Sequence, residues 1–490
     1  MHRINTAGAI ACAMLFALSA SGPALVARAQ PSTEKIPITT ASAEARHLYL
    51  QGRDLAEKLR ATDARRFYEQ AAAKDKSFAL AQLGLANTSG TTKDFIDAVT
   101  RAVALAGPVS QGERLMIRGL EANMKGDPAG VLASYTELVR LYPDDERAQT
   151  LLGNTYFGRQ EYELAIKHFA RATAIDPSFS QPYNQLGYAY RFIEKFEEAE
   201  KAFKKYTQLI PGDPNPYDSY AELLMKMGRF DESIKMYEKA LSIDPNFIAS
   251  HIGIGSNYLS MGRVEEARQS FARIAAVARN TGERRQARFW TAAAHVHEGA
   301  TDKALEELRA AYALAEAEGD AGTMSGDLTQ MGDVLREAGR PAEALAKYEE
   351  AVAVINKSQV PEEVKEATRR THIFEEGRVA VARNDLAAAK AKSADYARQV
   401  ALKKRPFEVR QQHELAGLIA LAEQQYATAA SELQLANQQD PRILYLTALA
   451  LQGTGDAQRA VALAAKAANF NGLSFNYGYV RGKARKLAGT

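Results

Sequence analysis

The sequence predicts an all-α solenoid of about twelve helix–turn–helix repeats, because three residue patterns share a period of 34. Prolines recur at this spacing at Pro143, Pro177, Pro211 and Pro245. Small residues recur in the same frame at Gly119, Gly153, Gly187, Ala221 and Gly255. Large aromatic residues follow them at Tyr135, Phe169, Phe203, Tyr237 and Phe271. Each period holds two helices and a turn, so we expect one helical pair to stack on the next.

Each repeated position has a physical reason. A glycine or alanine allows two antiparallel helices to approach closely, where a larger side chain would push their axes apart. The aromatic ring fills the neighbouring space. Proline ends the second helix of a unit, because it lacks an N–H group and clashes with the preceding turn. One unit cannot bury its apolar face alone, so stacking is obligatory.

The N-terminus has the features of a cleavable signal peptide over residues 1–29. Arg3 supplies a positive charge, residues 7–18 are apolar, and residues 27–29 read Ala-Arg-Ala, a typical cleavage site. A membrane anchor is the alternative, although the apolar run is shorter than the roughly 20 residues that span a bilayer. The chain's one cysteine, Cys12, lies in this segment. Residues 30–43, which contain Pro31 and Pro37, are expected to form a flexible lead-in.

The repeats divide into two predicted arrays. An N-terminal array covers residues 44–280 and is most regular over 112–278, whereas a C-terminal array with longer helices covers 281–470. The arginine-rich stretch 279–288 marks the junction between them. We expect the two arrays to differ in curvature. Residues 471–490 are expected to form a capping helix and a basic tail.

The unit that ends at Pro177 resembles a known repeat family. The matching residues of this unit are Leu152, Gly153, Tyr156, Ala165, Phe169, Ala172 and Pro177. It resembles the tetratricopeptide repeat in every family position except the leading tryptophan, and the whole chain is similar to an exported bacterial protein of this kind. The resemblance implies a right-handed superhelix. It also implies that the first helix of each unit lines a concave groove, where peptides or partner helices bind.

Mapping exposed first-helix positions of the regular array selects eleven candidate groove residues: Arg147, Asn154, Phe157, Gln181, Asn184, Tyr188, Arg191, Phe192, Asp218, Glu222 and Lys226. Tyrosine and arginine are common at the energetic centres of interfaces, and asparagine can hydrogen-bond an extended backbone. The alternative is an ordinary solvated helix face. If Tyr188 and Arg191 serve binding alone, replacing both with alanine leaves the melting temperature unchanged.

The sequence contains no motif for catalysis, a cofactor or a metal. It has neither the phosphate-binding Gly-x4-Gly-Lys-Ser/Thr loop nor the zinc-binding His-Glu-x-x-His helix. The 62 Lys and Arg residues nearly balance 59 Asp and Glu residues, so composition does not favour nucleic-acid binding. After the signal segment, no stretch is apolar enough to form an integral membrane segment. The oligomeric state stays open.

These observations favour a non-catalytic scaffold that binds a protein or peptide through its groove, in the periplasm or outside the cell. An alternative is a structural component of a periplasmic secretion or assembly machine, for example one that exports polysaccharide. An enzyme or a solute-binding protein is less favoured, because the repeats account for nearly all of the chain after the signal segment.

Overall fold

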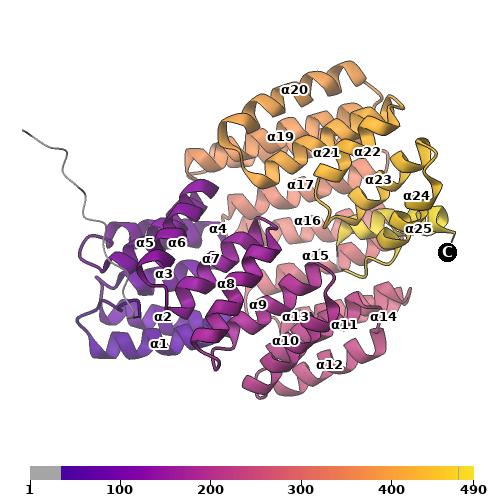
Figure 1. Ribbon diagram of the computed structural model, residues 1–490. Helices are drawn as coiled ribbons and strands as arrows, with labels where there is room; N and C mark the ends of the chain where they lie inside the picture. Colours follow the sequence, from indigo (N-terminus) through magenta and orange to yellow (C-terminus); the bar gives the residue numbers. More distant parts are fainter. Residues whose placement is uncertain (1–34, 473, 490) are drawn as a thin grey trace, which may run out of the picture.

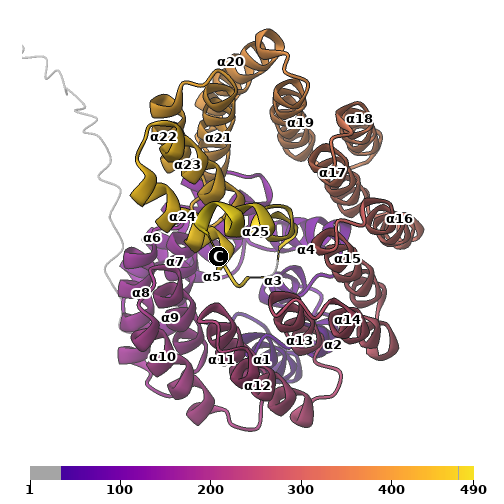
Figure 2. The ribbon, with the colours of Figure 1, turned by 90° about the vertical axis from the view of Figure 1, so that its right-hand side faces the viewer.

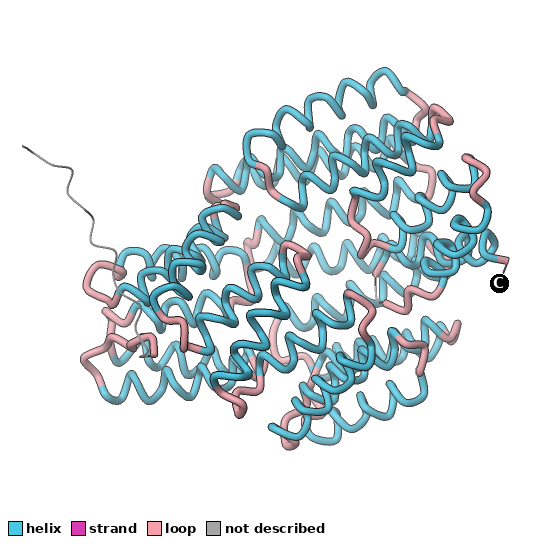
Figure 3. The backbone as a smooth tube through the Cα atoms, in the orientation of Figure 1, coloured by secondary structure: helices cyan, strands magenta, loops and turns pink. Residues whose placement is uncertain are grey.

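The computed structural model describes residues 35–472 and 474–489, and within these ranges it contains 25 helices and no strand (Figures 1 and 3). The predicted all-α solenoid is confirmed, since the first 24 helices form twelve consecutive pairs and α25 follows them. The predicted signal peptide, residues 1–29, lies outside the described residues.

The first fourteen helices are 9–15 residues long. They are α1 (Ala43–Glu57), α2 (Ala61–Lys74), α3 (Ala79–Asn87), α4 (Thr92–Ala104), α5 (Gln111–Met124), α6 (Pro128–Leu141), α7 (Glu146–Gly158), α8 (Tyr162–Ile175), α9 (Gln181–Phe192), α10 (Phe196–Leu209), α11 (Asn215–Lys226), α12 (Phe230–Ile243), α13 (Ile248–Ser260) and α14 (Val264–Val277).

Helices lengthen at Thr281, and the next seven have 17–21 residues. They are α15 (Thr281–His297), α16 (Thr301–Ala317), α17 (Ala321–Glu337), α18 (Pro341–Lys357), α19 (Glu362–Ala382), α20 (Leu386–Lys403) and α21 (Pro406–Ala422). The last four return to 10–14 residues. They are α22 (Tyr426–Leu435), α23 (Pro441–Gly453), α24 (Ala457–Ala468) and α25 (Phe475–Ala488).

The small and aromatic positions of the repeat meet inside each helical pair. A Cβ atom built on Gly187 of α9 would lie 2.5 Å from Cε1 of Phe203 on α10. Gly153 has the same relation to Phe169, also at 2.5 Å. Both phenylalanine rings are fully buried, so they cannot swing away. The period of 34 therefore repeats one contact, a ring laid against the backbone of the facing helix.

Gly187→Val is expected to destabilise the protein by about 1–3 kcal/mol, because the branched side chain overlaps the fixed ring of Phe203. Urea unfolding followed by circular dichroism measures the loss. The matched control is Gly326→Ala in α17, where an added Cβ meets no atom within 4 Å. This control should be stabilised by about 0.5–1 kcal/mol through helix propensity, and equal destabilisation of both variants would contradict the packing argument.

The solenoid winds far enough for its later helices to lie against its early ones. We call α1–α14 the first turn, α15–α25 the second turn, and the contact between them the seam. At the seam, Thr92 at the start of α4 donates its N–H to Asp320, the N-cap of α17, at 3.1 Å. Arg481 of α25 donates to the carbonyl of Leu259 in α13 at 2.7 Å. Figure 2 shows the helices arranged around a ring, with α25 near its middle.

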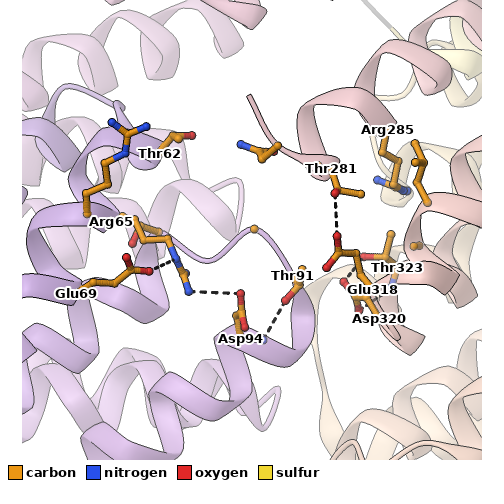
Figure 4. A pocket seen from close by; sticks show the side chains of 17 residues that line it. Thr62, Arg65, Glu69, Thr91, Asp94, Thr281, Arg285, Glu318, Asp320 and Thr323 are labelled. Carbon is orange, nitrogen blue, oxygen red and sulfur yellow. Dashed lines mark hydrogen bonds and ion pairs between the residues drawn. The ribbon is translucent and has the colours of Figure 1, made fainter. Parts of the chain in front are cut away.

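A cavity of about 390 Å³ lies at the seam between α2, α4, α15 and α16 (Figure 4). Several of its polar and charged side chains are already engaged with other groups of the chain. Arg65 bonds Glu69 at 3.0 Å and Asp94 at 3.4 Å, while Thr281 donates to Glu318 at 2.8 Å. This part of the seam is thus a polar, internally paired contact.

The expected flexible lead-in is wrong for residues 35–42, which we call the strap. The strap runs past the starts of α7, α5 and α3. Ile36 donates its N–H to Asp145 at 2.9 Å, and Thr39 donates its N–H to Glu113 at 2.7 Å. The Thr40 hydroxyl donates to Asp75 at 2.5 Å. Acidic groups at the N-cap of α7, in the first turn of α5 and at the end of α2 therefore hold the strap. The proline content of the segment concealed this role.

None of the described helices combines the length with the apolar character that a membrane-spanning segment needs.

Candidate functional site

The candidate site is a cavity of about 710 Å³ between the strap and the helices α1, α3, α5 and α7, which we call the first groove. Tyr49 and Arg53 of α1 and Arg147 and Asn154 of α7 line it, together with Gln181 at the start of α9. These residues come from the first helices of their units. The groove is thus concave, mixed in polarity and within the volume range of ligand-binding clefts.

Arg147 is the charged centre of the first groove. Its Nε atom donates to Glu57 at 2.6 Å and its Nη2 atom at 3.1 Å, and its guanidinium lies 4.8 Å from the centre of the Phe179 ring. Burial alone would lower the pKa of Arg147, but the hydrogen bonds and charges of Glu57 and Glu146 outweigh it and raise the pKa. Arg147 is therefore a fixed cation held between α1 and α7.

Asn154 and Gln181 differ from Arg147 because their side chains are unengaged. Both are half-buried, and neither side chain forms a hydrogen bond with any residue in the described part of the chain. An amide in this position can donate to and accept from the backbone of a bound chain. These two residues are the strongest binding candidates among the eleven.

Two predicted groove residues are buried, so their expected exposure is wrong. Asn184 is 2% exposed and Asp218 is 4% exposed. Asp218 accepts a hydrogen bond from Ser250 at 2.7 Å, and burial, assisted by the charge of Glu222, raises its pKa to about 8. The first helix of the following unit covers these positions, which the 34-residue frame alone did not reveal.

Five further candidates, none fully exposed, form a cluster of side chains that contact one another: Phe157, Tyr188, Arg191, Phe192 and Glu222. Arg191 pairs with Glu222 at 3.0 Å and lies 4.9 Å from the ring centre of Tyr188. Tyr188 also packs edge-on against Phe203 at 5.3 Å. Because both side chains hold α9 against α10 and α11, we now expect replacement of Tyr188 and Arg191 to lower stability as well.

Lys226 belongs to the seam instead of an open groove. Its Nζ atom donates to the carbonyl of Phe470 at 2.6 Å and lies 3.7 Å from the centre of that ring. Burial, and secondly the charge of Arg191, lower the pKa of Lys226 to about 8. The structure thus brings only Arg147, Asn154 and Gln181 to the first groove and divides the other eight between packing and the seam.

Sequence reasoning missed Tyr49, Arg53 and Glu57 of α1, because the mapping was applied only to the regular units. The signal was present. Arg53 directly follows Gly52, as Asn154 directly follows Gly153, and both glycines are the small residue of their repeat. Extending the frame to the first unit would have selected Arg53.

Comparisons with known proteins agree with the repeat pattern. Residues 153–191 match a family model described as TPR repeat, and residues 180–213 and 224–294 match models described as tetratricopeptide repeat. No curated protein matches the sequence.

Several solved structures are similar to this chain. MamA is 26% identical with a TM-score of 0.29, aligned over 34% of this chain and 91% of MamA. A thermophilic TPR protein of Thermus thermophilus is 19% identical with a TM-score of 0.32, over 36% of this chain and 96% of its own. A chain of the APC/C hetero-tetramer Cut9–Hcn1 is 15% identical with a TM-score of 0.41, over 86% of this chain and 76% of its own.

Proposed function

We propose that this chain, which belongs to the tetratricopeptide-repeat family, is a non-catalytic scaffold that holds an extended segment of a partner protein in the first groove. The carrying observation is the strap. Residues 35–42 lie along this groove without helical structure, and two of their backbone N–H groups donate to Asp145, the N-cap of α7, and to Glu113 in the first turn of α5. The chain itself therefore demonstrates how an extended backbone is held at this edge.

The groove supplies what a partner segment needs beyond that edge. Arg147 offers a fixed cation, Tyr49 and Leu83 offer apolar surface, and the amides of Asn154 and Gln181 can pair with a backbone. Binding of this kind depends on hydrogen bonds and apolar contacts and needs no catalytic nucleophile. We propose that it takes place in the periplasm or outside the cell, on the basis of the signal-like residues 1–29.

The double variant Asn154→Ala with Gln181→Ala is expected to weaken partner capture by about tenfold, since each lost hydrogen bond contributes roughly 0.5–1.5 kcal/mol. Its melting temperature should stay close to that of the wild type, because neither side chain bonds another described residue. The partner is first identified with a photo-crosslinking residue at position 154 in intact cells, and its affinity is then measured by calorimetry.

Crosslinking from the exposed Arg309 of α16 serves as the positional control. A partner captured equally from positions 154 and 309, or an affinity unchanged in the double variant, would reject the groove assignment. Capture of an outer-membrane component from position 154 would favour the alternative role in a secretion or assembly machine.

A further inference from the structure

A second cavity, of about 480 Å³, lies at the seam between α5, α6 and α7 of the first turn and the start of α21. Its walls are mainly apolar and include Leu120, Val131, Tyr135, Leu151 and Phe407. Phe407 is 57% exposed, which is unusual for a phenylalanine at the mouth of an otherwise buried contact. We call this space the seam cavity.

Two arginines at the start of α21, its N-cap Arg405 and Arg410, line the seam cavity without a full set of hydrogen-bond partners. Within the described part of the chain Arg410 makes one hydrogen bond, a 3.4 Å bond from Nη1 to the carbonyl of Arg159, and its buried Nε has no hydrogen-bond partner. Arg405 donates to the carbonyl of Lys125 at 3.2 Å and lies 3.5 Å from Glu408, and its buried Nε is also unpartnered.

The seam cavity holds one arginine, Arg410, without a carboxylate partner among the described residues, whereas Arg159 pairs with Glu161 and Arg405 with Glu408. Its charged lining consists of Arg159, Arg405, Arg410 and a single carboxylate, Asp127. Asp127 is engaged in capping α6, since it accepts the N–H of Gly130 at 2.9 Å. Arg410 forms no ion pair with any carboxylate in the described part of the chain. Burial, with the charge of Arg159 adding to it, lowers the pKa of Arg410, so an anion beside it would be stabilised.

We infer that the seam cavity binds a small amphipathic carboxylate, with its apolar chain between Leu120, Val131 and Leu151 and its carboxylate on the guanidinium of Arg410. A planar guanidinium binds a carboxylate through N–H donors, and the Nη2 atom of Arg410 forms no hydrogen bond within the described part of the chain. The apolar walls favour transfer of a hydrocarbon chain out of water. Arg405 is already paired with Glu408, so the carboxylate preference depends on Arg410.

This site goes beyond the proposed function and lies apart from the strap. The two cavities adjoin, because Asn87, Leu151 and Asn154 line both of them. The partner site in the first groove and the carboxylate site in the seam cavity can nonetheless be tested independently of each other. Arg410 lines only the seam cavity, whereas Gln181 lines only the first groove.

The test uses the full chain with decanoate and decanol, which share an apolar chain and differ in charge. Decanoate is expected to bind with one molecule per chain by calorimetry and to raise the melting temperature, and decanol should bind at least about tenfold more weakly. Arg410→Met should remove this preference, so that both compounds bind with the affinity of decanol. Arg309→Met removes the same charge from an exposed position of α16 and should keep the preference.

A second variant blocks the space and keeps both arginines. Gly158, at the end of α7, lines the seam cavity, and a Cβ added to it meets no atom within 4 Å. The variant Gly158→Phe should therefore fold and place its ring in the cavity. It should weaken decanoate and decanol alike by about tenfold or more. Absence of decanoate binding to the wild type, equal binding of decanoate and decanol, or unchanged decanoate affinity in Arg410→Met or Gly158→Phe would overturn the inference.

Discussion

Arg378→Met is expected to destabilise the protein by about 3–5 kcal/mol, because it removes the central cation of a buried ionic cluster. Arg378 lies in α19 with 7% of its side chain exposed. Its Nη1 atom is 2.9 Å from Glu375 and 3.1 Å from Asp333, and Nε is 3.8 Å from Glu414. Although burial lowers the pKa of Arg378, these three carboxylates raise it well above its ordinary value, so the guanidinium is always charged.

The loss is large because the substitution leaves Glu375 without its cation. Asp333 keeps Arg336 at 3.2 Å and Glu414 keeps Arg442, but Glu375 has only Arg378 as an ion-pair partner among the described residues. A buried carboxylate without a cation must lose its hydration or take up a proton. Urea unfolding at neutral pH measures the difference from the wild type.

Two further variants isolate this effect. Adding Glu375→Gln to Arg378→Met should recover much of the lost stability, since the uncompensated charge is gone. Arg398→Met in α20 removes an arginine that is 72% exposed and pairs with Asp395, and it should cost less than about 1 kcal/mol. A loss for Arg378→Met as small as that for Arg398→Met would show that the cluster is only a solvated surface.

The packing of the repeat could be predicted because it is local and periodic. Gly187 and Phe203 are 16 residues apart and meet inside one helical pair, and the same contact returns at Gly153 and Phe169. One short-range rule therefore specified the pairing of helices. This part of the fold could be predicted from the sequence because the same glycine–aromatic contact recurs from unit to unit.

The groove could be predicted only in part, because the exposure of a first-helix residue depends on the neighbouring unit. Asn154 and Gln181 face the first groove, whereas Asn184 and Asp218 occupy similar helices but are covered by the next unit. The position of a residue within the repeat predicts which face of its helix it lies on. It does not predict how far the next unit covers that face.

The seam and the strap lay beyond sequence reasoning, since their contacts join residues with no periodic relation. Lys226 bonds the carbonyl of Phe470, 244 positions away, and Ile36 bonds Asp145, 109 positions away. Such contacts depend on the summed rotation of many repeats, and a small change per unit would move them apart. The seam cavity exists only because this summed rotation brings α21 onto the ends of α5 and α7.

Acidification is expected to loosen α25 from α15 through His297, with a loss of about 3 kcal/mol between pH 6.5 and 4. His297 is half-buried at the end of α15, and its ring centre lies 5.9 Å from that of Tyr477 in α25. Burial, and then the charge of Arg481, lower the pKa of His297 from 6.5 to about 4. In the unfolded chain the ring takes up a proton near pH 6.5, so the unfolded state binds more protons throughout this window.

The sign follows from that difference in bound protons. The contribution of the neutral His297 ring to the free energy of unfolding is fully present above pH 6.5, falls as the pH drops, and is lost near pH 4. The single tryptophan, Trp290, gives a fluorescence signal local to this contact. Its ring centre lies 5.0 Å from that of Phe289, and the ring centre of Phe289 lies 4.9 Å from that of Phe475 in α25. Urea unfolding monitored by Trp290 fluorescence at a series of pH values should therefore show the midpoint falling with pH.

His297→Gln cannot take up the proton, so its urea midpoint should fall less steeply between pH 6.5 and 4 than that of the wild type. The matched control is His47→Gln at an exposed position of α1, which should keep the pH dependence of the wild type. Parallel pH profiles for the wild type and His297→Gln would contradict the assignment. Other groups titrate in both proteins, and the difference between the two profiles isolates the contact between His297 and α25.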